Sequence, residues 1–342
     1  MAYTTIDDSS AHFQTVLYTG TGSSRSVTND GNSDLQPDWL WFKKRNNSKS
    51  HVLNDTTRGI TKSIYSNENS GEGTESAGLS SVNSDGFTVG SEDRYNGSSE
   101  TYVCWQWKCN GGTTSTNGDG GVNVTIQENS TAGFNIMKWN GDGTTTSTVG
   151  HGLGATPDMI LNKYGLDGSS NWGVAFPKFE TSKLLTLNGT NAFATASGMS
   201  SYNSSTFVDG NGAATGGTIA YAFKNIQGYS KMGKYIGNGN SDGPFIYTGF
   251  KPAFILGKNA TSAGNHWFMN DSKRGGNGGA NWIKADSSAA ELTNLTNPDF
   301  YSNGFKIRND NAIYNENNSE FYYMAFAVHP FTSSKGVPVT AG

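Results

Sequence analysis

Short apolar stretches, separated by polar segments rich in Gly and Asn, run along the whole chain. In Thr218–Lys224 the large side chains of Ile219, Tyr221 and Phe223 alternate with alanines, and this two-residue period is that of a β-strand. Trp39–Phe42 has no alternation, which predicts a strand that is covered on both faces. The pattern therefore favours an all-β protein.

Turn signals agree with this prediction. The dipeptides Asp85-Gly86 and Asn303-Gly304 precede strand-like stretches and supply the left-handed residues that tight hairpins need. Helical periodicity is scarce, and only residues 179–185 and 287–292 are long enough for one or two helical turns.

One sequence pattern occurs three times. An aromatic-x-Gly-x-Gly turn is followed by Pro or Pro-Asp and then by a short apolar run that ends at Lys. The glycines of the three copies are Gly20 and Gly22, Gly141 and Gly143, and Gly237 and Gly239, and the lysines are Lys43, Lys163 and Lys258. Glycines at alternate positions predict positive φ or a close approach of strands. Phosphate binding is a more specific interpretation of these glycines. The signal for it is weak, because no third glycine and no amphipathic helix follow.

Each copy also closes with an aromatic strand, at Tyr102–Lys108, Thr218–Lys224 and Phe321–Ala327. An internal repeat takes precedence over single-residue signals. We therefore predict three tandem antiparallel β-sandwich repeats, jelly-roll-like, over residues 1–112, 122–227 and 228–331, with a Gly/Ser/Thr/Asn linker at 110–121 and a C-terminal tail at 332–342.

A second internal match is Asp-x-x-Arg-Gly, which joins Asp55, Arg58 and Gly59 in the first copy and Asp271, Arg274 and Gly275 in the third. An Asp at this position caps a turn and pairs with the Arg three residues later. The alternative is a grip on a carboxylate or a sugar. The structural interpretation is favoured, because the second copy has Phe176–Glu180 instead.

Composition and charge exclude several classes of protein. The net charge is −4 and basic residues do not cluster beyond Lys43–Arg45, which argues against nucleic acid. The longest apolar run, Phe321–Val328, is too short for membrane insertion, and the first residues do not resemble a secretory signal. Cys104 and Cys109 are predicted to be unpaired thiols.

Candidate chemistry is sparse. The five histidines are scattered singly, so we predict no metal site, and the Asn-Gly-Asp-Gly segments lack the further ligands of a calcium loop. No Gly-x-Ser-x-Gly elbow is present, and His151 lies between glycines as a turn residue would. We therefore predict no catalytic residues and no cofactor.

Several longer phrases together resemble an uncharacterised tandem β-domain family of tailed bacteriophages, especially marine phages and cyanophages. They are Met1–Ile6, Thr131–Ile136, Val149–Gly154, Tyr229–Lys231, Gly243–Phe254, Asn303–Arg308 and Tyr323–Ala327. The resemblance covers essentially the whole chain. It implies a virion structural protein, often tail-fibre-like, on the particle surface after assembly in the host cytoplasm, and it brings no catalytic residues.

The expected partners are accordingly other virion proteins of the tail or capsid, together with a host-surface glycan or protein. Tandem β units place their loops where recognition usually occurs, so host contact at the tail or fibre is the first hypothesis. Head decoration on the capsid exterior is the alternative, and a glycan-degrading enzyme ranks third. A homo-oligomer is compatible with each of these roles.

Overall fold

The three-dimensional structure is a computed structural model, and it describes residues 3–195, 198–210, 216–277, 280–293 and 297–339. It is all-β with antiparallel sheets, as the sequence predicts. The helical elements in the described residues are single turns: η1 (Ser9–Ala11), α1 (Asp93–Asn96) and α2 (Ala312–Asn315).

The same order of four strands occurs three times in the larger sheets, and it defines three units. Unit 1 contains β1 (Phe13–Thr19), β9 (Thr101–Trp107), β3 (Trp39–Lys44) and β4 (Val52–Asp55), in that order. Unit 2 contains β12 (Phe134–Trp139), β20 (Thr218–Phe223), β14 (Met159–Lys163) and β15 (Trp172–Phe176). Unit 3 contains β21 (Ser230–Ile236), β28 (Glu320–Pro330), β23 (Phe250–Asn259) and β24 (Phe268–Asp271).

A smaller sheet of three strands accompanies each of these, again in one order. The strands are β2 (Arg25–Val27), β8 (Gly86–Val89) and β7 (Leu79–Asn83) in unit 1; β13 (Ser147–Gly150), β19 (Thr206–Asp209) and β18 (Met199–Ser200) in unit 2; and β22 (Phe245–Tyr247), β27 (Gly304–Lys306) and β26 (Asp299–Tyr301) in unit 3. A buried apolar cluster between the two sheets of each unit holds them together.

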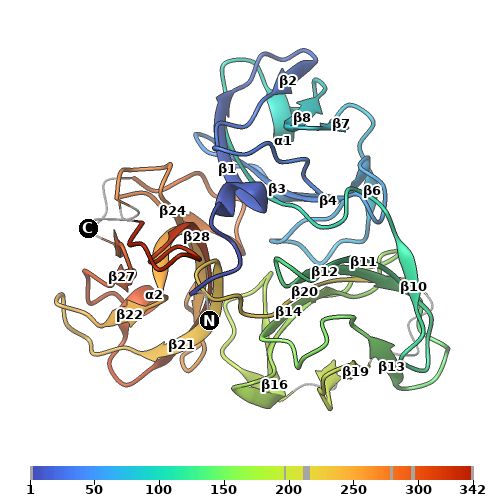
Figure 1. The fold of residues 1–342 in the computed structure, drawn as a ribbon. Coiled ribbons are helices and arrows are strands. Elements are labelled where there is room, and N and C mark those ends of the chain that lie inside the picture. Colours follow the sequence, from blue (N-terminus) through green and yellow to red (C-terminus); the bar gives the residue numbers. More distant parts are fainter. Residues whose placement is uncertain (1–2, 196–197, 211–215, 278–279, 294–296, 340–342) are drawn as a thin grey trace.

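Further strands extend this plan. They are β5 (Lys62–Ser63) with β6 (Gly73–Thr74) in unit 1, β10 (Ser115–Asn117), β11 (Val124–Asn129), β16 (Glu180–Thr186) and β17 (Ala194–Thr195) in unit 2, and β25 (Ile283–Lys284) in unit 3. Strand β11 pairs with β12, and β10 pairs with the other edge of β11. Figure 1 shows the three units as lobes around a common centre.

The largest buried cluster lies at that centre and is shared by all three units. Across unit boundaries, the ring centroids of Trp39 and Tyr221 are 4.3 Å apart, and those of Phe13 and Phe326 are 5.2 Å apart. Stacked and edge-on rings at these distances stabilise a core beyond their buried area. The units are therefore joined by an aromatic core and not merely threaded on one chain.

The large face of each aromatic strand points into this shared core. Tyr221 and Phe223 lie there, whereas Ala220 and Ala222 face the cluster between the two sheets of unit 2. The alternation thus predicted the two faces of the strand. It did not predict that the larger side chains fill the space between units, because the period of a strand fixes its faces but not the neighbour of each face.

Two local predictions are wrong. Residues 179–185 belong largely to strand β16, which pairs with β15, and residues 287–292 are not helical. The segment 110–121, predicted as a linker, connects unit 1 to unit 2 and contains one short strand, β10, which is hydrogen-bonded to β11. Pairing with a neighbouring strand outweighs the weak local preferences of such short segments.

Candidate functional site

The Asp-x-x-Arg-Gly motif of unit 1 forms a closed turn after β4. The Asp55 carboxylate accepts hydrogen bonds from the backbone N–H and the Nε of Arg58, at 2.8 and 2.6 Å. The Arg58 guanidinium also donates to the Leu53 carbonyl at 3.1 Å and pairs with Glu72 at 3.1 Å. Burial lowers the pKa of Arg58, but Asp55, followed by Tyr221 and Glu72, outweighs this effect and raises the pKa above its ordinary value, so the side chain stays charged.

Unit 3 repeats this geometry. Arg274 donates through its backbone N–H and Nε to Asp271 at 2.9 and 2.6 Å, and to the Met269 carbonyl at 3.1 Å. Glu291 takes the place of Glu72, and it also binds Arg45 of unit 1 at 2.8 Å. The side chains of both Asp–Arg pairs are fully buried.

Each of these carboxylates also binds an aromatic strand of another unit. Tyr221 of unit 2 donates to Asp55 Oδ2 at 2.8 Å, and Trp105 of unit 1 donates through Nε1 to Asp271 Oδ2 at 2.9 Å. Tyr221 and Trp105 occupy the same register position, opposite Leu161 and Trp41. Both motifs therefore hold two units together.

The third unit boundary shows why unit 2 lacks the motif. Phe176 takes the place of Asp55, because its neighbour Ala175 lies opposite Ile160 as Asn54 lies opposite Leu40. The residue of β28 that corresponds to Tyr221 is Met324, which donates no hydrogen bond there. Phe176 instead packs on the Tyr322 ring, with centroids 5.0 Å apart. Two unit boundaries thus have a carboxylate paired with an aromatic donor, and the third has an apolar pair of rings instead.

The three lysines that end the apolar runs are buried at unit boundaries. Lys163 Nζ of unit 2 donates to the Asn69 carbonyl of unit 1 at 3.2 Å, and Lys258 Nζ of unit 3 donates to the Thr190 carbonyl of unit 2 at 3.4 Å. Burial lowers the pKa of Lys43 to about 7 and the pKa of Lys163 and Lys258 to about 8. Lys163 and Lys258 thus satisfy carbonyl groups of a neighbouring unit, whereas Lys43 donates to the Lys44 and Asn47 carbonyls of its own unit.

The repeated glycines serve two backbone needs. A Cβ at Gly20 would lie 2.1 Å from the Gly97 oxygen, and one at Gly237 would lie 2.2 Å from the Glu316 oxygen. Gly22, Gly143 and Gly239 have positive φ, and Gly141 is half-buried in the loop after β12. The motif builds a turn and shows no cradle for a phosphate.

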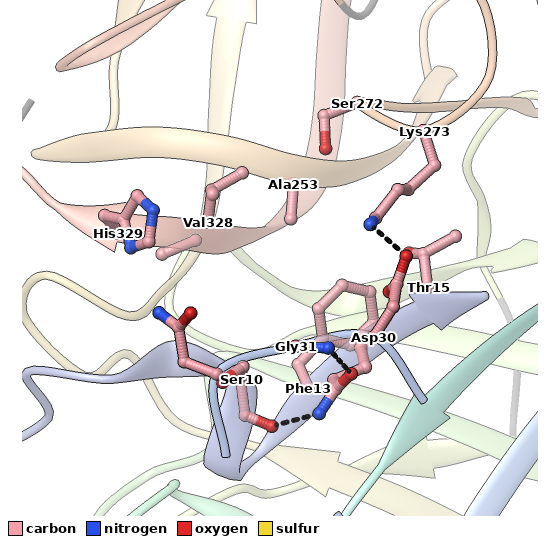
Figure 2. Close-up of a pocket in the computed structure, with 13 residues that line it drawn as sticks. Ser10, Phe13, Thr15, Asp30, Gly31, Ala253, Ser272, Lys273, Val328 and His329 are labelled. Atoms are coloured by element: carbon pink, nitrogen blue, oxygen red, sulfur yellow. Dashed lines mark hydrogen bonds and ion pairs between the residues drawn. The ribbon is translucent and has the colours of Figure 1, made fainter. Parts of the chain in front are cut away.

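A cavity of about 190 Å³ lies between unit 1 and unit 3 (Figure 2). Phe13 and Thr15 of β1 line it on one side, and Val328 and His329 of β28 line it on the other. Lys273 reaches across to Asp30 at 2.7 Å. The buried Thr15 Oγ1 has no hydrogen-bond partner among the described residues. The cavity is large enough for waters, and its lining is mainly apolar with a few polar groups such as Thr15 Oγ1.

The lining residues of this cavity include few groups that could act in catalysis. Asp30 is the carboxylate among its lining residues, it is paired with Lys273, and both side chains are largely exposed. A glycoside hydrolase needs two facing carboxyl groups. Sequence patterns did not reveal the cavity, because its residues come from five separate segments and share no spacing.

Other candidate residues have structural partners. His151 accepts a hydrogen bond from the Leu153 N–H through Nδ1 at 3.2 Å, which is a turn role. Cys104 and Cys109 are free and buried, and burial raises the pKa of both thiols. In the described ranges no group of three His, Cys, Asp or Glu side chains is placed to hold a metal ion. None of the described helices is long and apolar enough to cross a membrane.

Comparison with known proteins identifies a family for this chain, but the description of that family gives no function. No curated protein matches the chain. Residues 8–330 match a family described as a domain of unknown function, DUF7483. The match spans all three units, so the family corresponds to the whole three-unit body and not to one repeat. This chain belongs to the DUF7483 family.

Proposed function

We propose that the protein is a non-enzymatic structural component of a bacteriophage particle, exposed on its surface, and that it contacts the host surface at the tail or fibre. The phage context comes from the resemblance of the repeat phrases described above. The observation that carries the structural role is the shared aromatic core, which fuses three units into one body. Within this proposal the units are tandem β-sandwich repeats of one module, and the jelly-roll-like strand order stays a prediction.

The contacts at the unit boundaries support the role of a rigid structural component. Two buried Asp–Arg pairs and three buried lysines bridge or border these boundaries, and each buried carboxylate has several donors. Buried charges that are fully hydrogen-bonded fix one arrangement of the units, because any other arrangement leaves a charge without partners. A body of fixed shape presents its loops in constant positions.

Host contact suits the outer surface. The turns between strands are rich in Asn, Ser, Thr and Gly, and the chain has few charged residues, at 15%. Polar neutral loops recognise glycans or proteins through hydrogen bonds that salt screens little. Weak contacts of this kind become effective when a particle carries many copies.

Head decoration is the second candidate. It is favoured by the arrangement of three similar units around one centre (Figure 1), which matches positions in a shell where three subunits meet. A glycan-degrading enzyme ranks third, because Asp30 would need a second carboxylate across the cavity.

Quantitative mass spectrometry of purified particles tests the proposal. A copy number similar to that of known tail proteins supports the tail role, whereas one close to that of the major capsid protein supports head decoration. Absence of the protein from particles contradicts both. Binding of the labelled full chain to host cells, with heat-unfolded protein and non-host cells as controls, then separates host recognition from a purely structural role.

A further inference from the structure

Unit 2 covers the outer edge of its first strand with a strand of its own. Thr125 and Gln127 of β11 lie opposite Lys138 and Ile136 of β12. Val124 and Ile126, at alternate positions of β11, are buried in the cluster between the two sheets. Strand β11 thus satisfies the backbone of β12 and closes the open side of the unit with two apolar side chains.

Strand β21 is the equivalent of β12 in unit 3, and no strand of the described residues covers its outer edge. In the described part of the chain β28 is its only sheet neighbour. Bonds from Ala327 N–H to the Tyr229 carbonyl, and from Gly237 N–H to the Ser319 carbonyl, show that odd-numbered residues bond to β28. Even-numbered residues therefore direct their backbone groups outward, as alternate residues of an edge strand do.

Two of these outward positions are already occupied. The Ser230 N–H donates to the Ile226 carbonyl at 2.9 Å, and at Met232 a side chain takes the place of a strand. The Asn225 side chain accepts from the Met232 N–H at 2.7 Å and donates to the Met232 carbonyl at 3.2 Å. This is the place that Gln127 takes opposite Ile136 in unit 2. Asn225 is exposed. Lys234 and Ile236 have no hydrogen-bond partner for their outward backbone groups among the described residues.

The side chains around this edge form a groove of about 360 Å³ between β21 and β22, with both apolar and polar groups in its lining. Phe179, Phe245 and Tyr247 line it, with 41%, 45% and 51% of their surface exposed, and Ile236 beside it is 49% exposed. Four large exposed apolar side chains around one edge that no described strand covers are unusual on a soluble surface and mark an interaction site. The groove lies where Val124 and Ile126 lie in unit 2.

The charge beside the groove indicates the chemistry of an occupant. Lys231 Nζ donates to the Tyr247 carbonyl at 2.7 Å and lies 5.5 Å from the centre of the Tyr247 ring. No carboxylate of the described residues pairs with it. Its equivalent in unit 2, Asn135, lies opposite Glu128 of β11. A strand added in the same register would bring an acidic residue to Lys231.

We infer that the free edge of β21 binds an extended segment of another polypeptide by strand addition. The segment has the pattern apolar-x-apolar-x-acidic. Its backbone bonds to Lys234 and its neighbours, its two apolar side chains enter the groove between Phe245 and Tyr247, and its carboxylate pairs with Lys231. Backbone bonds supply affinity in this mode of recognition, and the alternate pockets supply specificity. The inference does not depend on the proposed function.

A peptide of residues 121–129, which contains β11, is the probe. Titrated as a fluorescent peptide against the full chain, it is expected to bind saturably and one to one, with a dissociation constant below about 1 mM. Hydrogen exchange at the amides of Lys234 and Ile236 is expected to slow in the complex. A scrambled peptide is expected not to bind.

Variants test each contact. Lys231→Glu is expected to weaken binding about tenfold, and a peptide with Glu128→Lys is expected to restore it. Asn225→Ala, which frees the Met232 groups, is expected to tighten binding. The matched control is Lys273→Glu, a charge reversal in the cavity of Figure 2, which is expected to leave binding unchanged. Thermal unfolding checks that each variant is folded.

No saturable binding, equal effects of Lys231→Glu and Lys273→Glu, or no protection of the two amides overturns the inference. Binding of a soluble oligosaccharide through Tyr247 without amide protection would also overturn it, because the groove would then be a site for glycan stacking.

Discussion

The hydroxyl of Tyr221 offers a direct test of how the units are joined. Tyr221→Phe removes one oxygen and leaves the ring stacked on Trp39, 4.3 Å away. It deprives Asp55 Oδ2 of a donor at 2.8 Å in a fully buried site. Hydrogen bonds to charged groups contribute about 1.5–3 kcal/mol, so we expect a loss of this size in the free energy of unfolding.

Tyr18→Phe is the matched control, because it removes a buried hydroxyl that donates to a neutral acceptor, the Tyr95 carbonyl, at 2.6 Å. The expected loss there is about 0.5–1.5 kcal/mol. Urea unfolding followed by tryptophan fluorescence measures both variants. A double-mutant cycle with Asp55→Asn isolates the bond itself, and we expect a coupling energy of about 1–2 kcal/mol.

The reasoning is refuted if Tyr221→Phe costs no more than Tyr18→Phe and the coupling with Asp55→Asn is absent. The unit boundary would then depend on ring packing alone. The same cycle with Trp105→Phe and Asp271→Asn examines the boundary between units 1 and 3, where the donor is an indole at 2.9 Å.

Three further predictions concern the shared core, the lysines and the glycines. Residues 228–331 expressed alone should not give a sharp thermal transition, because Phe254 and Phe326 would lose their partners in units 1 and 2; a cooperative transition at the temperature of the full chain would contradict a shared core. The folded pKa of Lys163 is about 8, below its ordinary value, so the unfolded chain binds more protons and stability should rise from pH 7 to pH 9; urea midpoints should show this rise, and Lys163→Met should reduce it. Gly20→Ala should lower the unfolding midpoint more than Gly143→Ala, since a Cβ at Gly20 would lie 2.1 Å from a carbonyl oxygen whereas Gly143 meets nothing and has only a φ of 84° to maintain; equal effects would exclude the steric explanation.

The local pattern was sufficient for the aromatic strands and for the repeated phrase, but not for β16, where it predicted helical turns. Alternation in Thr218–Lys224 gave the two faces of β20, and the aromatic-x-Gly-x-Gly phrase aligned the units in the register that the sheets have. These features are local, because the side-chain period of a strand and the φ of a turn glycine depend on neighbouring residues. The Asp-x-x-Arg pairs were predictable for the same reason, since their partners lie three residues apart.

What the aromatic faces contact was decided by tertiary structure alone. The residues of a strand do not show whether a face packs against the second sheet of its own unit or against another unit. The shared core, the bond from Tyr221 to Asp55 and the cavity at Thr15 therefore could not be predicted. The contacts between Tyr221 and Asp55 join residues that are 166 positions apart. The sequence by itself determined three similar β units, and packing around a common centre determined that they form one body, because burial of the large aromatic faces requires all three.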